Sequence, residues 1–165
     1  MSNGINGKRV IVTAGGSGIG RAIVDRFVAA GARVHTCDVQ QEFLDDVVAS
    51  DDRVSGSLAD VGEPRDVENM VAAAVETMGG IDVLVNNAGI GGPRAALEDI
   101  SYADWDRTIG VNLNGMFYCI KNVAPHMKAQ SSGCIVNIST ASAKVALPMR
   151  SPYVASKVGV LGLTH

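Results

Sequence analysis

Tyr153 and Lys157 are the residues whose types and spacing point most directly to chemistry. They lie four positions apart in a segment that we expect to be helical from near Pro152, so both side chains share one face. A phenol has an ordinary pKa of about 10 and is a poor base at neutral pH. A lysine ammonium close to it stabilises the phenolate and lowers that pKa. The pair could therefore move a proton to or from a substrate. The alternative is a surface Tyr/Lys pair of the kind found on many helices.

Hydroxyl side chains gather just after the apolar run Ile135–Ile138, at Ser139, Thr140 and Ser142. Any one of them could hold a substrate oxygen opposite Tyr153, and equally such residues form turns. If the chain stays extended to residue 140, Ser139 and Thr140 point to opposite faces, so only one of them can face the site.

Asn112 is a polar residue on an otherwise apolar helical stripe. It lies three positions after Ile109 and faces inward with Leu113 and Met116. A buried amide must find hydrogen-bond partners. The sequence leaves two interpretations open, a structural hydrogen bond to a neighbouring loop or a polar member of a site.

A glycine-rich turn joins the apolar run Arg9–Thr13 to a helical segment that starts near Ile19. Gly18 and Gly20 would let the backbone approach a pyrophosphate closely. The helix N-terminus would offer it free N–H groups and partial positive charge. The alternative is a tight turn without a ligand.

Asp38 lies 18 residues after Gly20, at the end of the second predicted strand. A carboxylate at this point can accept both hydrogen bonds from an adenosine ribose diol, and it would repel a 2′-phosphate. No basic residue stands at Ser17 to offset that repulsion. The spacing therefore predicts NAD rather than NADP as the cofactor, against the alternative of a solvated Asp at a strand end.

Composition and charge exclude several classes of function. Fourteen Lys and Arg against 17 Asp and Glu give a net charge of −3, which argues against nucleic-acid binding. No apolar run approaches the ~20 residues of a membrane span, and the N-terminus lacks the apolar core of a secretory signal. Three widely spaced cysteines predict reduced thiols in a cytoplasmic compartment. No histidine has a spaced Cys, His or carboxylate partner, so no metal site is expected.

Apolar, β-branched runs alternate with segments of helical period. The expected strands are Arg9–Thr13, Ala32–Cys37, Arg53–Leu58, Ile81–Val85 and Ile135–Ile138. The expected helices run from Ile19 to Ala30, from about Glu42 to Ala49, from just after Pro64 to Met78, from about Ser101 to Met127, and from near Pro152. This alternation predicts an α/β fold of three α/β/α layers, with a doubly wound parallel sheet of Rossmann type and strand order 3-2-1-4-5. Residues 1–165 would form a single domain.

Ligands of such sheets bind outside the carboxyl ends of the strands. The glycine turn, Asp38, Asp60, the Asn86–Gly89 turn and the Ser139–Thr140 pair all follow strands, so this edge is the predicted site. The chain ends inside its last predicted helix without a stop signal. We interpret this as a fragment that lacks C-terminal strands, or as a frayed helix.

Together these features resemble the classical short-chain dehydrogenases/reductases from Lys8 to the last residue. The matching motifs are Thr13–Gly20, Asp38, Asp60–Val61, Asn86–Gly89, Asn112 and Tyr153–Lys157. The resemblance implies that Tyr153 is the acid/base, that Lys157 lowers its pKa and binds the nicotinamide ribose, and that Asn112 holds a water in a proton relay. It implies a cofactor-binding set of Gly15, Ser17, Gly18, Ile19, Gly20, Asp38, Asp60, Val61, Asn87, Ala88, Gly89, Tyr153 and Lys157, with Asp60 near the adenine and the Asn87 turn beside the adenosine.

Three departures from the family pattern matter. The family usually has Gly after the motif threonine, where this chain has Ala14 with a methyl group that could crowd the turn. The family serine 13 residues before the tyrosine falls at Thr140, which keeps the hydroxyl and adds a methyl group. Family members also continue past this helix with further strands and a segment that covers the substrate.

The sequence thus predicts an NAD-dependent oxidoreductase that interconverts a secondary alcohol and a ketone. Its expected catalytic residues are Asn112, Thr140, Tyr153 and Lys157. The alternative is a dinucleotide-binding module, or a truncated remnant, without turnover. The expected partner is a small alcohol or ketone, and the resemblance implies a homodimer or homotetramer for a full-length protein. The loop Ile90–Ile100 shows no diagnostic charge pair that would identify the substrate.

Overall fold

Five parallel strands form one sheet in the order β3-β2-β1-β4-β5, which confirms the order predicted from the alternating elements. The computed structural model describes residues 4–145 and 147–164, so Met1–Asn3, Ala146 and His165 lie outside the described residues. The strands are β1 (Arg9–Thr13), β2 (Arg33–Asp38), β3 (Val54–Leu58), β4 (Val83–Asn86) and β5 (Cys134–Asn137). Each begins and ends within two residues of its predicted bounds.

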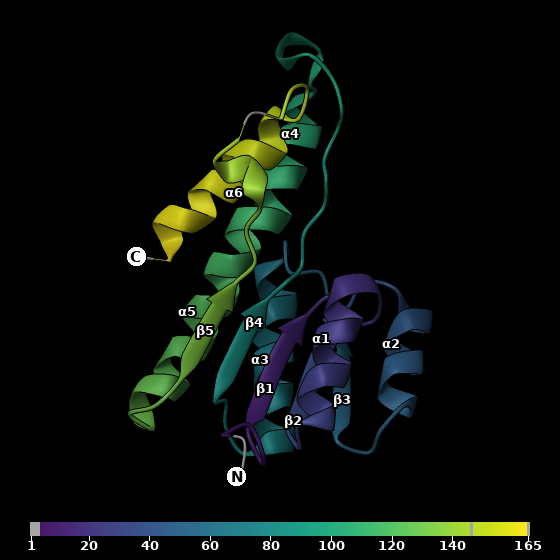
Figure 1. The fold of residues 1–165 in the computed structure, drawn as a ribbon, viewed down its shortest axis with the longest axis vertical. Coiled ribbons are helices and arrows are strands. Elements are labelled where there is room, and N and C mark those ends of the chain that lie inside the picture. The colour runs from purple at the N-terminus through teal and green to yellow at the C-terminus, as the bar shows by residue number, and fades with distance from the viewer. Residues whose placement is uncertain (1–3, 146, 165) are drawn as a thin grey trace.

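Helices cover both faces of this sheet, as Figure 1 shows. They are α1 (Gly18–Ala29), α2 (Gln41–Ala49), α3 (Pro64–Met78), α4 (Tyr102–Ile109), α5 (Gly115–Ala129) and α6 (Ser151–Leu163). Helices α1 and α2 pack on one face, and α3 and α5 pack on the other. Helix α6 instead packs against α4, beyond the carboxyl end of β5. The three-layer α/β/α architecture is therefore confirmed.

The central strand β1 contributes to a core on each face of the sheet. Val10 and Val12 face α1 and α2, whereas Ile11 faces α3 and α5, and all three side chains are fully buried. Near-continuous apolar runs of this kind are typical of parallel strands that are covered on both sides. This burial fixes the positions of the strand ends, where the polar motifs lie.

The single long helix predicted between about Ser101 and Met127 is divided in the structure. A π-helical turn, Gly110–Asn114, separates α4 from α5. Gly115 follows it, and a Cβ atom there would lie 2.9 Å from the carbonyl oxygen of Val61. Glycine therefore lets α5 approach the segment after β3. Such π turns occur frequently at functional sites.

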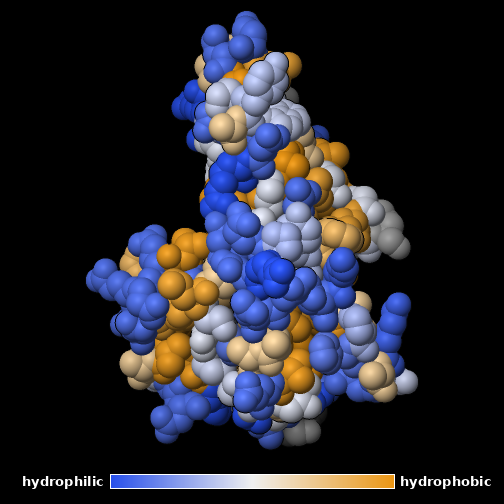
Figure 2. All heavy atoms as spheres, turned by 180° about the vertical axis from the view of Figure 1, so that it is seen from behind, coloured by the Kyte–Doolittle hydropathy of each residue, from blue (hydrophilic) through white to orange (hydrophobic). Residues whose placement is uncertain are grey.

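Polar side chains cover most of the surface that is turned away from the view of Figure 1. Figure 2, which views the molecule from behind, shows a largely hydrophilic face on which apolar residues gather in separate patches. None of the described helices is both long and apolar enough to cross a membrane.

His35 on β2 makes the stability of the sheet sensitive to acid. Its Nδ1 and Nε2 lie 2.8 and 2.9 Å from the hydroxyls of Ser55 and Ser57 on β3, and the side chain is buried. Desolvation lowers the pKa of His35 from 6.5 to about 4. The unfolded chain then binds a proton more readily, so stability is lost as pH falls from 6.5 toward 4, by up to ~1.4 kcal/mol per pH unit.

We expect urea unfolding to report this loss directly. The free energy of unfolding should fall between about pH 6.5 and 5 in the unmodified protein, and the fall should be much shallower in His35→Gln, which cannot titrate. His126→Gln, on the partly buried side of α5, is the matched control and should keep the original slope. Equal slopes in all three proteins would contradict this role of His35.

Candidate active site

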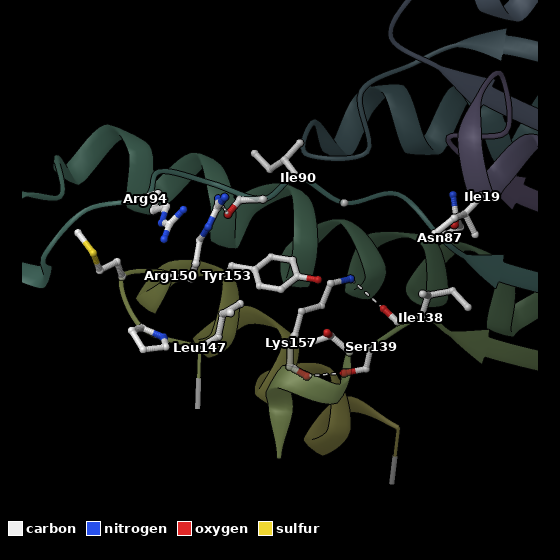
Figure 3. Close-up of a pocket in the computed structure, with 15 residues that line it drawn as sticks. Ile19, Asn87, Ile90, Arg94, Ile138, Ser139, Leu147, Arg150, Tyr153 and Lys157 are labelled. Atoms are coloured by element: carbon white, nitrogen blue, oxygen red, sulfur yellow. Dashed lines mark hydrogen bonds between the residues drawn. The ribbon is translucent and has the colours of Figure 1, made fainter. Parts of the chain in front are cut away.

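The site predicted at the carboxyl edge of the sheet is present as a cavity of about 860 Å³. Its walls come from the start of α1, the loop after β4, the chain after β5 and the first two turns of α6 (Figure 3). The lining includes Ile19, Asn87, Gly89, Ile90, Ser139, Thr140, Tyr153 and Lys157. A second cavity of about 140 Å³ lies at the same edge and is lined by Ala14, Asp38, Asp60, Val61 and Ala88. Gly89 and Ile90 line both cavities, so the two adjoin.

Tyr153 and Lys157 face the larger cavity from α6, as their spacing predicts. In Figure 3 the Tyr153 hydroxyl points toward the Lys157 ammonium. The Lys157 Nζ donates a 2.8 Å hydrogen bond to the carbonyl oxygen of Ile138, which fixes the ammonium at the end of β5. Lys157 is only 4% exposed, and burial lowers its pKa from the ordinary value. The phenol therefore has a fixed cation beside it.

The hydroxyl residues after β5 differ in their positions. Ser139 and Thr140 both line the cavity, and Ser142 is not among its lining residues. The Ser139 hydroxyl donates to the carbonyl oxygen of Lys157 at 2.9 Å, so it is tied to α6. Thr140 has an extended backbone, and its hydroxyl accepts a 3.3 Å bond from the Ser142 amide. The structure thus leaves Ser139 and Thr140 as the two candidates that reach the cavity.

Asn112 lies in the π turn and is completely buried. Its Oδ1 accepts from the Ile90 amide at 2.7 Å, and its Nδ2 donates to the Ile90 carbonyl oxygen at 2.9 Å. The same Nδ2 donates to the hydroxyl of Ser156 at 3.0 Å. The structural hydrogen bond to a neighbouring loop, one of the two interpretations open from the sequence, is therefore present. The side chain joins the loop after β4 to α6, and it is not among those that line the cavity.

The glycine turn lies against β2 and β4. The Gly15 amide donates to the Cys37 carbonyl oxygen, and a Cβ on Gly20 would collide with the Ala14 carbonyl oxygen, which explains the glycine. Ser17 starts α1 without a side-chain cap, and the first turn contains no acidic residue. The amides of that turn are therefore available to an anion, with the positive end of the helix dipole behind them.

Ala14, the first departure from the family pattern, has a φ of +53°. This left-handed conformation costs little for glycine and is strained for a residue with a Cβ. The sequence analysis expected the Ala14 methyl group to crowd the turn. The structure adds a second reason why the family has glycine here, namely the positive φ of this residue. The turn still forms, with Gly15 and Gly16 after it.

Asp38 is held at the end of β2 by two amides. Its carboxylate accepts from Gly16 at 3.2 Å and from Gln40 at 3.1 Å, and the residue is 7% exposed. A Cβ on Gly16 would lie 2.7 Å from the same carboxylate, so the turn and Asp38 are in direct contact. The carboxylate lines the smaller cavity, where the spacing argument expects it.

The Asn87 turn and Asp60 complete this edge. The Asn87 amide side chain donates to the Thr13 carbonyl oxygen at 3.0 Å, and the Thr13 hydroxyl accepts from the Asn87 and Ala88 amides. Asp60 forms a 2.7 Å ion pair with Arg107 of α4. The sequence analysis missed Arg107, because nothing in local spacing relates it to Asp60.

Sequence reasoning also missed Arg94 and Arg150, which line the larger cavity. The available signal was the position of Arg150, three residues before Tyr153 and directly before the helix that carries it. In the described part of the chain, no group of three or more His, Cys, Asp or Glu side chains could hold a metal ion.

Comparisons with known proteins identify the family. The family model for short chain dehydrogenases matches residues 8–165. The chain is 43% identical over 161 residues to a 2-(R)-hydroxypropyl-CoM dehydrogenase of Xanthobacter autotrophicus, covering 93% of this chain and 64% of that protein. It is 36% identical over 168 residues to a cyclohexanol dehydrogenase of an Acinetobacter species, covering 99% of this chain and 67% of that protein.

Comparison with solved structures leads to the same family. An NAD⁺-bound xylitol dehydrogenase superposes with a TM-score of 0.93 at 31% identity, covering 98% of this chain and 64% of that one. A levodione reductase superposes with a TM-score of 0.92 at 36% identity, covering 96% of this chain and 64% of that one. The chain thus spans about 64% of the length of several relatives that it matches. This chain belongs to the short-chain dehydrogenase/reductase family.

Proposed function

We propose that this chain is the cofactor-binding and proton-transferring part of an NAD-dependent oxidoreductase that interconverts a secondary alcohol and a ketone. The observation that carries the proposal is the Tyr153 hydroxyl in the cavity, directed at the buried Lys157 ammonium. A module that only bound a dinucleotide would not need a phenol with a cation held beside it.

The residues present fit a dinucleotide. The uncapped first turn of α1 is suited to a pyrophosphate, and the Asp38 carboxylate beside the smaller cavity is suited to a ribose diol. Asp60, Val61 and Ala88 line the space expected for adenine. The bound cofactor would accept or return a hydride, and the chain's own residues would position the substrate and manage its proton.

Proton transfer falls to Tyr153. In oxidation, its hydroxyl oxygen takes the proton of the substrate hydroxyl as the carbon loses hydride, and in reduction it gives that proton back. Lys157 stabilises the phenolate form, and its hydrogen bond to Ile138 prevents the ammonium from swinging away. Thr140 or Ser139 would hold the substrate oxygen during the transfer. Asn112 acts here as a positioning residue, since its bonds to Ile90 and Ser156 hold the loop after β4 against α6.

Two further parts of the proposal concern the protein's surroundings. The three cysteines are free, and Cys37 and Cys119 are buried, which supports a reducing, cytoplasmic compartment. Trp105 on α4 and Phe117 on α5 are partly exposed large side chains. The family resemblance implies a homodimer or homotetramer, and an interface between copies that used α4 and α5 would cover these side chains.

The cofactor preference is expected to follow Asp38. NADH should bind about 10- to 150-fold more tightly than NADPH, the difference that the loss of charge-assisted hydrogen bonds typically makes. Replacing Asp38→Ser together with Val39→Arg should shift the preference toward NADPH. Titrations followed by NADH fluorescence measure both affinities. Equal affinities for the two cofactors in the unmodified protein would refute the assignment.

The acid/base is tested by removing one oxygen. Tyr153→Phe should leave NADH binding nearly unchanged while turnover of a secondary alcohol falls ~10²–10⁴-fold. Lys157→Ala should weaken both binding and turnover, because the ammonium would serve the ribose as well as the phenol. A Phe variant that keeps more than about a tenth of the turnover would rule out Tyr153 as the proton carrier.

The assisting hydroxyl is tested by four variants assayed in steady state. We expect Thr140→Ser to be tolerated and Thr140→Val, which is isosteric but lacks the hydroxyl, to lose most turnover. Ser139→Ala and Ser142→Ala should have mild effects, because Ser139 is bonded to α6 and Ser142 is not a lining residue. If Thr140→Val stays active while Ser139→Ala is inactive, the role passes to Ser139.

A further inference from the structure

We propose that the substrate of the larger cavity carries an anionic group, a carboxylate or a sulfonate, which Arg94 and Arg150 bind while its hydroxyl faces Tyr153. The inference rests on the oxidoreductase function proposed above and narrows its substrate class. It concerns the half of the cavity that the dinucleotide and the proton-transferring pair do not use.

The charge of the cavity wall is the first argument. Among the described residues that line it, three are basic, Arg94, Arg150 and Lys157, and none is acidic. The chain as a whole carries a net charge of −3, so this cluster is opposite in sign to the net charge of the chain. A recess lined by charge of one sign concentrates ligands of the other sign.

The two arginines have donors to spare. Lys157 donates a hydrogen bond to the carbonyl oxygen of Ile138, and in the proposed function its ammonium serves the phenol and the ribose. The Arg150 Nη1 donates to the carbonyl oxygens of Gly91 and Gly92 at 3.0 and 2.8 Å, which leaves its Nη2 and Nε. Within residues 4–145 and 147–164, neither Arg94 nor Arg150 forms an ion pair. A guanidinium with free N–H groups is suited to the paired oxygens of a carboxylate or sulfonate.

The local backbone holds Arg150 in place. A Cβ on Gly91 would lie 3.1 Å from the Arg150 Nη1, so glycine allows the guanidinium to lie against this loop. The Ala95 amide donates to the Met149 carbonyl oxygen at 3.1 Å, which joins the loop after β4 to the segment before α6. Met149 has a φ of +62°, an uncommon conformation for a residue with a side chain. Strained backbone of this kind tends to occur at ligand sites.

The positions of the side chains along the cavity indicate that the arginines would bind an anionic group of the substrate rather than of the cofactor. In Figure 3, Ile19 and Asn87 lie at one end, beside the start of α1 where a pyrophosphate fits. Arg94 and Arg150 lie at the opposite end, on the far side of the Tyr153 ring from Lys157. The apolar side chains of Ile90 and Leu147 line the space as well. A short hydroxy acid could therefore place its hydroxyl at Tyr153 and its anion between the arginines.

Binding is the readout that does not require turnover. We would titrate NADH-saturated protein calorimetrically with methyl carbinol acids of increasing length: 3-hydroxybutanoate, 4-hydroxypentanoate and 5-hydroxyhexanoate. Each acid is compared with its neutral primary amide. A second series compares 3-hydroxybutane-1-sulfonate with its neutral sulfonamide. At least one anion should bind ~10-fold or more tightly than its neutral partner. The series with the larger ratio of affinities shows whether the site prefers a carboxylate or a sulfonate.

The variants assign the effect to the arginines. Arg94→Met and Arg150→Met should each weaken binding of the preferred anion by ~10-fold or more, with affinity for the neutral partner and for NADH changed less than about threefold. Arg94 forms no ion pair among the described residues, so its variant tests the charge and leaves the two bonds from Arg150 to the loop in place. Arg26→Met, on the exposed face of α1 at its C-terminal end, is the matched control and should change nothing.

The outcomes separate this inference from the proposed function. Arginine-dependent binding of the anion without NADH formation from NAD would support the anion site and refute the oxidoreductase. Oxidation of acids and amides at equal kcat/KM, with equal losses in both arginine variants, would overturn the anion site and leave the oxidoreductase intact. Failure of every acid and sulfonate to bind would also overturn the anion site.

Discussion

The buried amide of Asn112 holds together the two halves of the site. One half, the glycine turn and the strand ends, is fixed by the sheet core, whereas α6 packs outside the sheet against α4. Asn112 bonds both backbone atoms of Ile90 and the Ser156 hydroxyl, so it connects the loop after β4 to the helix that carries Tyr153. Because Asn112 and Ser156 are fully buried and the two bonds to Ile90 are partly buried, removing this side chain would leave unpaired polar groups, which is costly.

The polarity of the site follows from that arrangement. Asp38 and the Asp60–Arg107 ion pair lie beside the smaller cavity, whereas Lys157, Arg94 and Arg150 line the larger one. The smaller cavity suits ribose hydroxyls, and the larger one suits a phenolate and an anionic substrate.

Local pattern was sufficient to predict the sheet order and nearly all of the helices. Strands covered on both faces form apolar runs, and glycines and prolines mark the ends, so Arg9–Thr13 or Pro64–Met78 can be identified without tertiary information. The π turn at Asn112 could not be predicted, because its extra residue is stabilised by contacts with Ile90 and Ser156, which are distant in sequence. The same holds for Arg150, whose partners Gly91 and Gly92 lie some sixty residues away. Spacing placed Ser139 and Thr140 directly after the last predicted strand, and in the structure both residues line the larger cavity.

We propose that the two adjoining cavities form one dinucleotide site with Tyr153 at its reactive end. A crystal structure of the protein with NADH tests this claim most directly. We expect the adenine beside Asp60 and Val61, the adenosine ribose on Asp38, the pyrophosphate at the first turn of α1, and the nicotinamide ring within contact of Tyr153 and Lys157. A cofactor bound in the reverse direction, or with its nicotinamide away from Tyr153, would contradict it.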